Sequence, residues 1–440
     1  MPRRILLVLV AAAFLIAALS GCSGTKKPAQ SPAPRQTVLI GIDAMDWAVV
    51  DPLLDAGKLP HFAALREQSL SGVNLSFVPL EKSPLIWASM ATGLSPEDHG
   101  VGGFLRGRGG EDYEVLASAG DWRAPAIWDI AGAADLTSCV IGWWVTYPAR
   151  EIPGVLVSDH VTYTDQGSRN PEGWVQPRDL TNALTPLTVS YDQVPLDLLR
   201  VLLPSATDEQ LNDLDDRQLR ELRVVLAGDL TYLATARHLA AQGSYDFFAV
   251  YLRGLDLVCH KYWHYMEGVD VKPAPAPERL ALLGQVVPNY MLLLDQWLGE
   301  IVSWFPADAN LVVVSDHGFH GPRRDRSGTV RKGVAEHRPE GALMVRSNLY
   351  QPGASFDRSF VMNVGPTLLA MLGLPASQDM PGRVLRDGLT EAGLIYVEHL
   401  EQHRLASYAG LAPAPPPEVA DDPSLDEAVK KQLRSLGYVD

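Results

Sequence analysis

Side chains that can do chemistry follow two apolar runs of this sequence. In "NLVVVSDHGFHG", residues 310–321, the apolar run leads directly to Asp316 and His317. In "YDFFAVYLRGLDLVCHKYW", a similar run is followed by Asp256 and His260. Because these two residues are four positions apart, a helical turn places both side chains on one face, where they can bind one ion.

Two further residues of the same types occur beside strand-like runs. Asp43 ends "TVLIGID", and His337 in "AEHRPEGALMV" precedes another apolar run. A lone Asp after a strand is often a helix cap, so no single member of the set is diagnostic. Together the set holds three Asp and three His, a mixture that suits a pair of zinc ions, with manganese as the weaker option.

A candidate nucleophile lies in "LEKSPLIWASMATGLSPEDHG". Ser83 precedes Pro84, a residue favoured in the first turn of a helix, so its hydroxyl would lie at the positive end of a helix dipole. An ordinary helix N-cap has the same local geometry. The local sequence therefore leaves both roles open for Ser83.

The elements that must position these residues are strands alternating with helices. The β-rich runs are "TVLIGID", "SCVIGWWV", "GVLVSD", "YDFFAVYL" and "NLVVVSD", and helical patterns are expected at 47–67, 83–92, 228–242 and 287–305. This alternation predicts an α/β fold with a mostly parallel central sheet flanked by helices. Open α/β sheets bind ligands at the carboxyl ends of their strands, where the polar clusters are expected to lie.

Five motifs in order resemble the alkaline phosphatase superfamily, and most closely its type I phosphodiesterase and nucleotide pyrophosphatase branch. They are "GIDAMDW", "LEKSPLIWASMATGLSPEDHG", "YLRGLDLVCHKYW", "VVVSDHGF" and "EHRPEGALMV". The resemblance covers roughly residues 37–165 and 245–385 and implies an alkaline phosphatase-like fold. Sulfatases of the superfamily carry a CxPxR-type motif, which "SPLIW" does not match.

The resemblance also implies a role for each candidate residue. One ion would be held by Asp256, His260 and His337, and the other by Asp43, Ser83, Asp316 and His317. Ser83 would be the nucleophile and form a phosphoseryl intermediate. The implied substrates are phosphodiesters or nucleotide pyrophosphates. A phosphomonoesterase or a phosphotransferase acting on lipid or glycan head groups remains the alternative, followed by a catalytically silent binding lipoprotein.

The N-terminal residues are typical of an exported lipoprotein. Residues 1–22, "MPRRILLVLVAAAFLIAALSGC", combine two arginines, an apolar run and small residues before Cys22. "LSGC" resembles the bacterial lipobox, which implies cleavage and lipidation at Cys22. Residues 23–36 are expected to form a flexible tether. The prediction is a lipid-anchored protein on the extracytoplasmic side of a bacterial membrane, in the cell envelope; an uncleaved membrane anchor is the alternative.

The rest of the chain divides around the motifs. We expect a catalytic domain from 37–165 and 245–390, a helical insertion or lid at 166–244, and a linker with a charged helical tail at 406–440. The net charge of −15 argues against nucleic-acid binding. Cys139 and Cys259 lie in apolar surroundings and are expected to be buried thiols. The sequence leaves the docking of the tail and the oligomeric state open.

Overall fold

The central strands are buried on both faces and mostly apolar. The computed structural model of the chain describes residues 36–106, 115–163, 172–266, 269, 274–320, 336–419 and 423–436. Every residue of β1 (Thr37–Ile42), β6 (Phe247–Leu252) and β7 (Asn310–Val314) is buried. Strands buried on both faces are typical of a parallel sheet covered by helices.

The main sheet has nine strands in the order β11-β2-β10-β7-β1-β6-β3-β4-β5. The remaining strands are β2 (Leu70–Leu75), β3 (Ser138–Ile141), β4 (Gly154–Val157), β5 (Val175–Gln176), β10 (Glu340–Arg346) and β11 (Ser355–Phe360), and β8 (Gly318–His320) pairs with β9 (Glu336–Arg338). β10 is antiparallel to β2 and β7, and β5 is antiparallel to β4; the other neighbours are parallel. The predicted mostly parallel sheet is therefore confirmed.

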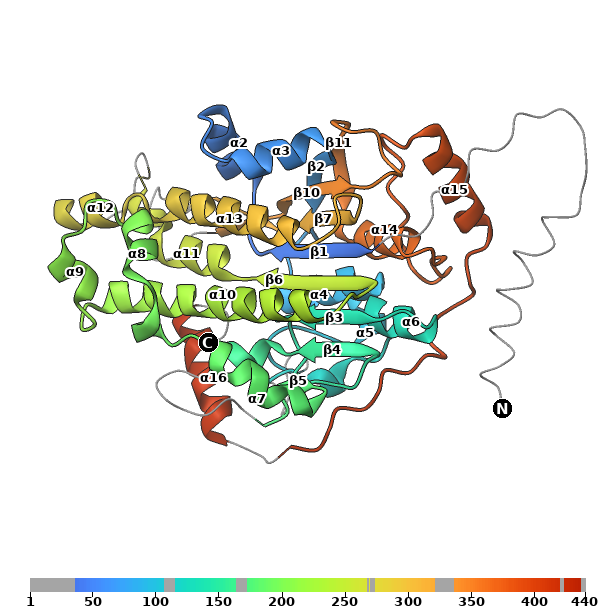
Figure 1. Cartoon of the computed structure of the whole chain (residues 1–440), viewed down its shortest axis with the longest axis horizontal. Helices are drawn as coiled ribbons and strands as arrows, with labels where there is room; N and C mark the ends of the chain where they lie inside the picture. The colour runs from blue at the N-terminus through green and yellow to red at the C-terminus, as the bar shows by residue number, and fades with distance from the viewer. Residues whose placement is uncertain are drawn as a thin grey trace, which may run out of the picture. The chain divides into compact units, whose positions relative to one another are not determined.

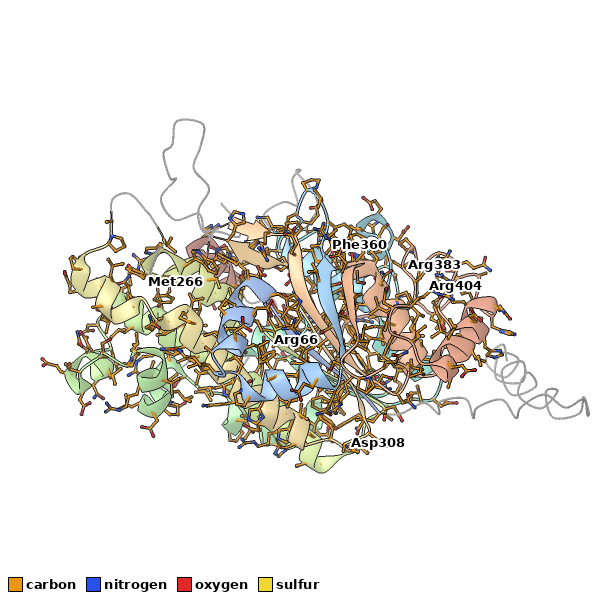
Figure 2. The ribbon with its side chains drawn as sticks, turned by 90° about the horizontal axis from the view of Figure 1, so that it is seen from above. Arg66, Met266, Asp308, Phe360, Arg383 and Arg404 are labelled. Atoms are coloured by element: carbon orange, nitrogen blue, oxygen red, sulfur yellow. The ribbon has the colours of Figure 1, made fainter. Side chains whose placement is uncertain are left out.

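The directions of the strands define two opposite borders of this sheet: the amino edge, where β1, β6 and β7 begin, and the carboxyl edge, where they end. β1 lies between β6 and β7 and runs parallel to both, so the three strands end at the same edge. β2 and β11 run the same way, because β2 is antiparallel to β10, which is itself antiparallel to β7. In Figure 2, Phe360 at the end of β11 and Asp308 just before β7 mark the opposite edges.

Helices cover both faces of the sheet. They are α2 (Trp47–Asp55), α3 (Pro60–Glu67), α4 (Ser83–Thr92), α5 (Pro96–His99), α6 (Ile127–Ala133), α7 (Thr181–Leu184), α8 (Leu196–Leu202), α9 (Asp208–Asn212), α10 (Arg217–Gln242), α11 (Gly254–Tyr262), α12 (Pro277–Leu283), α13 (Val286–Ser303), α14 (Val364–Met371), α15 (Glu391–Gln402) and α16 (Pro423–Leu436). In Figure 1, α10 and α13 lie in front of the sheet and α4 lies behind it.

Two of the predicted helices illustrate what local sequence determines. The helix expected at 47–67 is two helices, because Gly57 adopts a left-handed conformation with φ of 66° and Pro60 starts α3. The helix expected at 83–92 has those bounds as α4. Pro84 occupies its first turn, and Gly93 ends it in a left-handed conformation with φ of 70°.

The segment predicted to be an insertion packs a helix against the sheet. Within residues 166–244, α10 starts at Arg217, earlier than expected, because the Asp216 carboxylate accepts hydrogen bonds from two backbone N–H groups of the first turn. α10 packs against β3 and β6. The two-residue strand β5 also lies in this segment, which was expected to lack strands. A lid function for the segment stays a prediction.

The charged tail docks on the domain. α16 contacts α11 and the 3₁₀ helix η3 (Asp159–Tyr163), and it buries Val429 and Leu433. Cys139 and Cys259 are free and buried, as expected. Among the described residues, no helix combines the length and apolarity that crossing a bilayer requires. The expected signal peptide, the lipidation site Cys22 and the tether up to residue 35 lie outside the described residues.

Candidate two-metal active site

Three neighbouring strands deliver the candidate ligands to one edge of the sheet. Asp43 directly follows β1, and Asp316 and His317 follow β7. Asp256 lies in the first turn of α11, the helix that follows β6, and His260 lies one turn later. Since β7, β1 and β6 are adjacent and parallel, all five side chains start from the same edge. The sixth, His337, comes from β9.

The side chains of Asp256, His260 and His337 converge. The Nε2 atom of His337 is 3.1 Å from Oδ1 of Asp256 and 2.9 Å from Nε2 of His260. The third side of the triangle, from His260 Nε2 to Asp256 Oδ1, measures 3.4 Å. Three potential ligand atoms thus lie around one point.

Asp43, Asp316 and His317 form a second group. Nε2 of His317 is 3.3 Å from Oδ1 of Asp43 and 3.4 Å from Oδ2 of Asp316. Nε2 of His317 is also 3.2 Å from Oγ of Ser83. His317 is near the first group too, because its ring stacks on His337 with centroids 3.9 Å apart. His317 is therefore a member of the second group and also lies against the first.

The distances suit a tetrahedral metal site. Zinc binds nitrogen and oxygen ligands at about 2.0–2.1 Å, so tetrahedral ligand atoms lie about 3.3 Å from one another. Six pairs of potential ligand atoms in the two groups are separated by 2.9–3.4 Å. This spacing is compatible with binding of divalent ions.

Unpaired carboxylate oxygens also fit cations at this position. The buried atoms Asp43 Oδ1, Asp256 Oδ2 and both carboxylate oxygens of Asp316 accept no hydrogen bond from the described residues. Burial raises the pKa of Asp256 and of Asp316 well above the usual range, and burial together with the charge of Asp256 raises the pKa of Asp43. Divalent ions would compensate three carboxylates that are costly to ionise without a partner.

The histidines have the protonation state that metal ligands need. Burial lowers the pKa of His317 to about 3 and that of His337 to about 4, and it lowers the pKa of His260 well below its usual value. All three are therefore neutral at pH 7. Nδ1 of His317 lies 3.1 Å from the carbonyl oxygen of Gly318, which can only accept, so Nδ1 donates and the Nε2 lone pair faces the cluster.

Ser83 lies at the start of α4 with its side chain 2% exposed. Its Oγ faces His317 Nε2, and the N-cap position of α4 is Lys82, which makes no capping hydrogen bond through its side chain. The hydroxyl is thus directed to the cluster and lies at the positive end of the helix dipole. The role of nucleophile remains a prediction that this geometry permits.

Asp46 links the β8–β9 hairpin, which carries His337, to α2. Its carboxylate accepts hydrogen bonds from the backbone of Ala48, at the start of α2, and of Phe319 in β8. It also pairs with Arg338 in β9. One side chain thereby links α2 to both strands of the hairpin. Sequence reasoning did not single out Asp46, although its position three residues after Asp43 was visible.

Other buried side chains have structural partners. Nε2 of His99 is 2.9 Å from Oγ of Ser89, and its Nδ1 accepts from the backbone of Val101, so His99 stabilises the turn after α4. Trp143 and Trp144 are buried among other aromatic rings.

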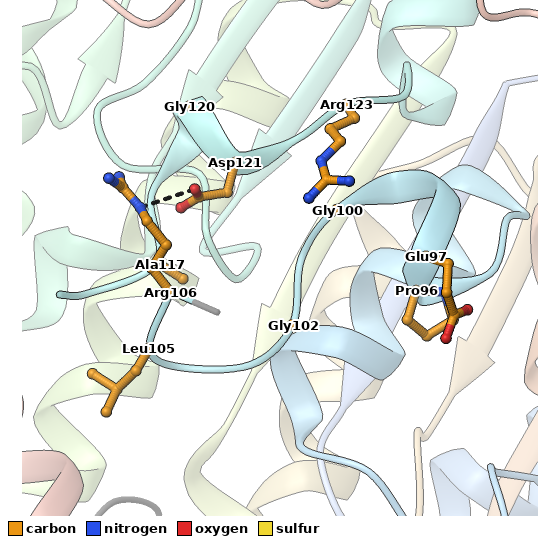
Figure 3. Close-up of a pocket in the computed structure, with 10 residues that line it drawn as sticks. All are labelled: Pro96, Glu97, Gly100, Gly102, Leu105, Arg106, Ala117, Gly120, Asp121 and Arg123. Carbon is orange, nitrogen blue, oxygen red and sulfur yellow. Dashed lines mark ion pairs between the residues drawn. The ribbon is translucent and has the colours of Figure 1, made fainter. Parts of the chain in front are cut away.

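A pocket of about 470 Å³ lies away from the candidate ligands. Figure 3 shows it between the segment around Gly102 and that around Gly120, with the Arg106–Asp121 ion pair on one side and Arg123 on the other. No candidate metal ligand lines it.

Comparisons with solved structures found chains that are similar to this one. Phosphonoacetate hydrolase from Sinorhizobium meliloti shares 17% identity over 71% of this chain and 63% of its own, with a TM-score of 0.42. Murine ectonucleotide pyrophosphatase/phosphodiesterase 5 shares 11% identity over 82% of this chain and 99% of its own, with a TM-score of 0.44. The phosphonate monoester hydrolase from Silicibacter pomeroyi shares 14% identity over 80% of this chain and 76% of its own, with a TM-score of 0.43. The chain thus spans less than two thirds of the phosphonoacetate hydrolase. No curated protein sequence matches it.

The fold and the clustered ligands define an α/β protein with a candidate two-metal centre at the carboxyl edge of its sheet. Within that class, the chain belongs to the type I phosphodiesterase / nucleotide pyrophosphatase family, whose model matches residues 37–338. The resemblance seen in the five sequence motifs is thereby confirmed.

Proposed function

We propose that the protein hydrolyses phosphodiesters or nucleotide pyrophosphates at a two-metal site, through a phosphoseryl intermediate on Ser83. The observation that best supports this is the convergence of one serine hydroxyl with three carboxylates and three neutral imidazoles at the ends of adjacent strands. Two divalent ions, zinc in our proposal, would neutralise the charge of the phosphate ester and activate the oxygens that enter and leave.

The residues of the chain prepare the serine for attack. Ser83 Oγ lies at the amino end of α4, whose dipole favours loss of its proton, and 3.2 Å from His317 Nε2, so an ion held by His317 would also lie beside this hydroxyl and favour its ionisation. Burial of Ser83 keeps bulk water from competing at this oxygen. Lys82 directly precedes Ser83 in the chain, and its positive charge would attract an anionic substrate.

A substrate panel tests the function. Purified protein would be stripped of metal with a chelator, reloaded with zinc or manganese, and assayed with a bis-aryl phosphate diester, an aryl phosphate monoester and a dinucleotide pyrophosphate. We expect turnover of the diester or the pyrophosphate that disappears on stripping and returns on reloading. A strong preference for the monoester would reject the diesterase assignment. Absence of turnover on every substrate would favour the silent binding protein.

The cellular site is also a proposal. We propose that residues 1–22 direct export, that Cys22 carries the lipid, and that residues 23–36 tether the enzyme to the membrane on its extracytoplasmic side. The sequence pattern "LSGC" supports this proposal. Small phosphate esters in the cell envelope would then be the substrates within reach of the active site.

A further inference from the structure

Tyr251 touches the cluster and belongs to neither ligand group. It lies in β6 and pairs with Gly41 of β1. Gly41 is two residues before Asp43 in the chain. We infer that Tyr251 is a positioning residue, which holds one oxygen of Asp43 so that the other stays directed at the metal site. The inference rests on the proposed function in that it treats Asp43 as a metal ligand.

The two oxygens of Asp43 have different surroundings. Oδ2 accepts a hydrogen bond from the hydroxyl of Tyr251. Oδ1 is buried, accepts no hydrogen bond from the described residues and lies 3.3 Å from His317 Nε2. The tyrosine therefore occupies one oxygen and leaves the other for a cation.

A third residue fixes the direction of the Tyr251 hydrogen bond. Nε1 of Trp144 donates to the Tyr251 oxygen at 2.6 Å. Indole nitrogen can only donate, so the phenol oxygen accepts here, and its single proton is left for Asp43. Both hydrogen bonds therefore point the same way: Trp144 donates to Tyr251, and Tyr251 donates to Asp43.

The ring of Tyr251 is held by aromatic neighbours. It meets Trp87 edge to face with centroids 4.9 Å apart, and Trp87 belongs to α4, the helix that begins with Ser83. A Cβ atom on Gly41 would lie 2.8 Å from the Trp87 ring and 3.2 Å from the Tyr251 ring. A side chain at position 41 would therefore displace the rings, and glycine leaves room for them.

The substitution Tyr251→Phe keeps the ring and removes the hydroxyl. Metal-ligating carboxylates depend on such hydrogen bonds, and losing one costs about 10–100-fold in metal affinity. We expect a loss of that size for one of two zinc ions, with the affinity for the other ion unchanged. The measurement is a competition titration of the metal-stripped full-length protein against a chromophoric zinc chelator.

Tyr350→Phe is the matched control. Tyr350 is also buried, and its hydroxyl donates to the carbonyl oxygen of Leu385 at 3.0 Å, outside the cluster. This variant is expected to lose stability but bind both zinc ions as tightly as the wild type. Trp144→Phe is a second variant in case Tyr251→Phe does not fold. It leaves the Tyr251 hydroxyl unanchored and is expected to cause a smaller loss at the same zinc site.

The outcomes separate this inference from the proposed function. If the folded Tyr251→Phe variant binds both ions as tightly as the wild type, the positioning role is wrong, whatever the activity. If Tyr251→Phe loses one ion while the wild type hydrolyses no phosphate ester, the positioning role stands and the proposed function fails. A wild type that binds no zinc overturns both.

Discussion

His317 is the residue at which the two ligand groups meet. Its Nε2 atom faces Ser83, Asp43 and Asp316, while its ring stacks on His337 of the other group. The family resemblance assigned it to one ion, but its position gives it contact with both halves of the site. The hydrogen bond from its Nδ1 to Gly318 fixes which nitrogen is available to bind.

Ser83→Ala tests the nucleophile. We expect turnover of the preferred phosphate ester to fall on the order of 10³-fold or more, because the entering oxygen is removed. The variant should stay folded and keep most of its metal, since three protein ligands remain in that group. Steady-state kinetics, elemental analysis and thermal unfolding are the measurements.

Ser89→Ala is the control for Ser83→Ala on the same helix. Ser89 is also buried, and its hydroxyl contacts His99 rather than the cluster. It should lose about 1 kcal/mol of stability and retain turnover. Near-normal activity of Ser83→Ala on all three substrates would reject the covalent mechanism.

The ligand groups are tested by removing one member of each. Asp316→Asn and His337→Ala should each reduce the metal content from about two ions per chain toward one, and the double variant should retain almost none. Elemental analysis after gel filtration measures this. Asp357→Asn with His399→Ala changes the same residue types at exposed positions and should keep both ions. A full metal complement in the Asp316/His337 double variant would remove the assignment.

At the scale of elements, the site depends on how helices start and end. α11 begins where the buried Asp229 of α10 accepts hydrogen bonds from the backbone N–H groups of Arg253 and Gly254, and Tyr290 of α13 donates to the same carboxylate. Three helices therefore fix the turn that carries Asp256. At the other end of the site, His99 fixes the turn between α4 and α5.

The turn at His99 gives a pH dependence with a definite sign. Burial lowers the pKa of His99 to about 4, from 6.5 when exposed. Below pH 6.5 the unfolded chain takes up a proton that the folded chain takes up only near pH 4, so stability is lost as the pH falls through this window. The contribution is on the order of 3 kcal/mol.

His99→Gln removes this titration. Measured by urea unfolding at pH 7.5 and at pH 4.5, the difference in free energy of unfolding between wild type and variant should shift in favour of the variant at the lower pH. The comparison cancels the titration of the cluster histidines, which is common to both proteins. An unchanged difference between the two pH values would contradict the buried neutral state of His99.

The strands that carry the site could be predicted from the sequence because each of them is recognisable from its own residues, without knowledge of its neighbours in the sheet. β1, β6 and β7 are short, fully apolar runs that end in Asp or His motifs, so both the strand and the edge could be inferred. β2 was not expected: "LSGVNL" contains Gly72, and only the structure shows that a Cβ atom there would lie 2.4 Å from the carbonyl oxygen of Phe356 in β11, so the glycine leaves room for that strand. That contact depends on a residue far along the chain.

The supporting residues could not be predicted for the same reason. Tyr251 was visible as a tyrosine in a buried strand, and a buried hydroxyl requires a partner. Its partner Asp43 is 208 residues away in sequence, and the order of the strands was needed to bring the two together. Sequence patterns give the face and the edge on which a side chain lies, but not its neighbour on the next strand.

At the scale of the whole molecule, the remaining expectation is the lipid anchor. Cys22→Ser should abolish labelling by a fatty-acid analogue in cells and leave the protein uncleaved or mislocalised. The purified variant lacking residues 1–35 should retain full activity, because the match to the family begins only at residue 37. Equal labelling of wild type and Cys22→Ser would contradict the lipoprotein assignment.

The place of β1 in the sheet has a consequence for how the protein is made. β1 is the first strand synthesised, yet its two neighbours start at residues 247 and 310. Paired residues of β1 and β6 are 210 positions apart (247 − 37), so at about 5–20 residues per second the ribosome needs roughly 10 to 40 s to reach the partner strand. For that time the apolar strand that ends at Asp43 has no native partner. We expect chaperones to raise the yield of folded protein, because they can shield this strand until the later strands emerge; an equal yield of folded protein with and without chaperones in cell-free synthesis would contradict this.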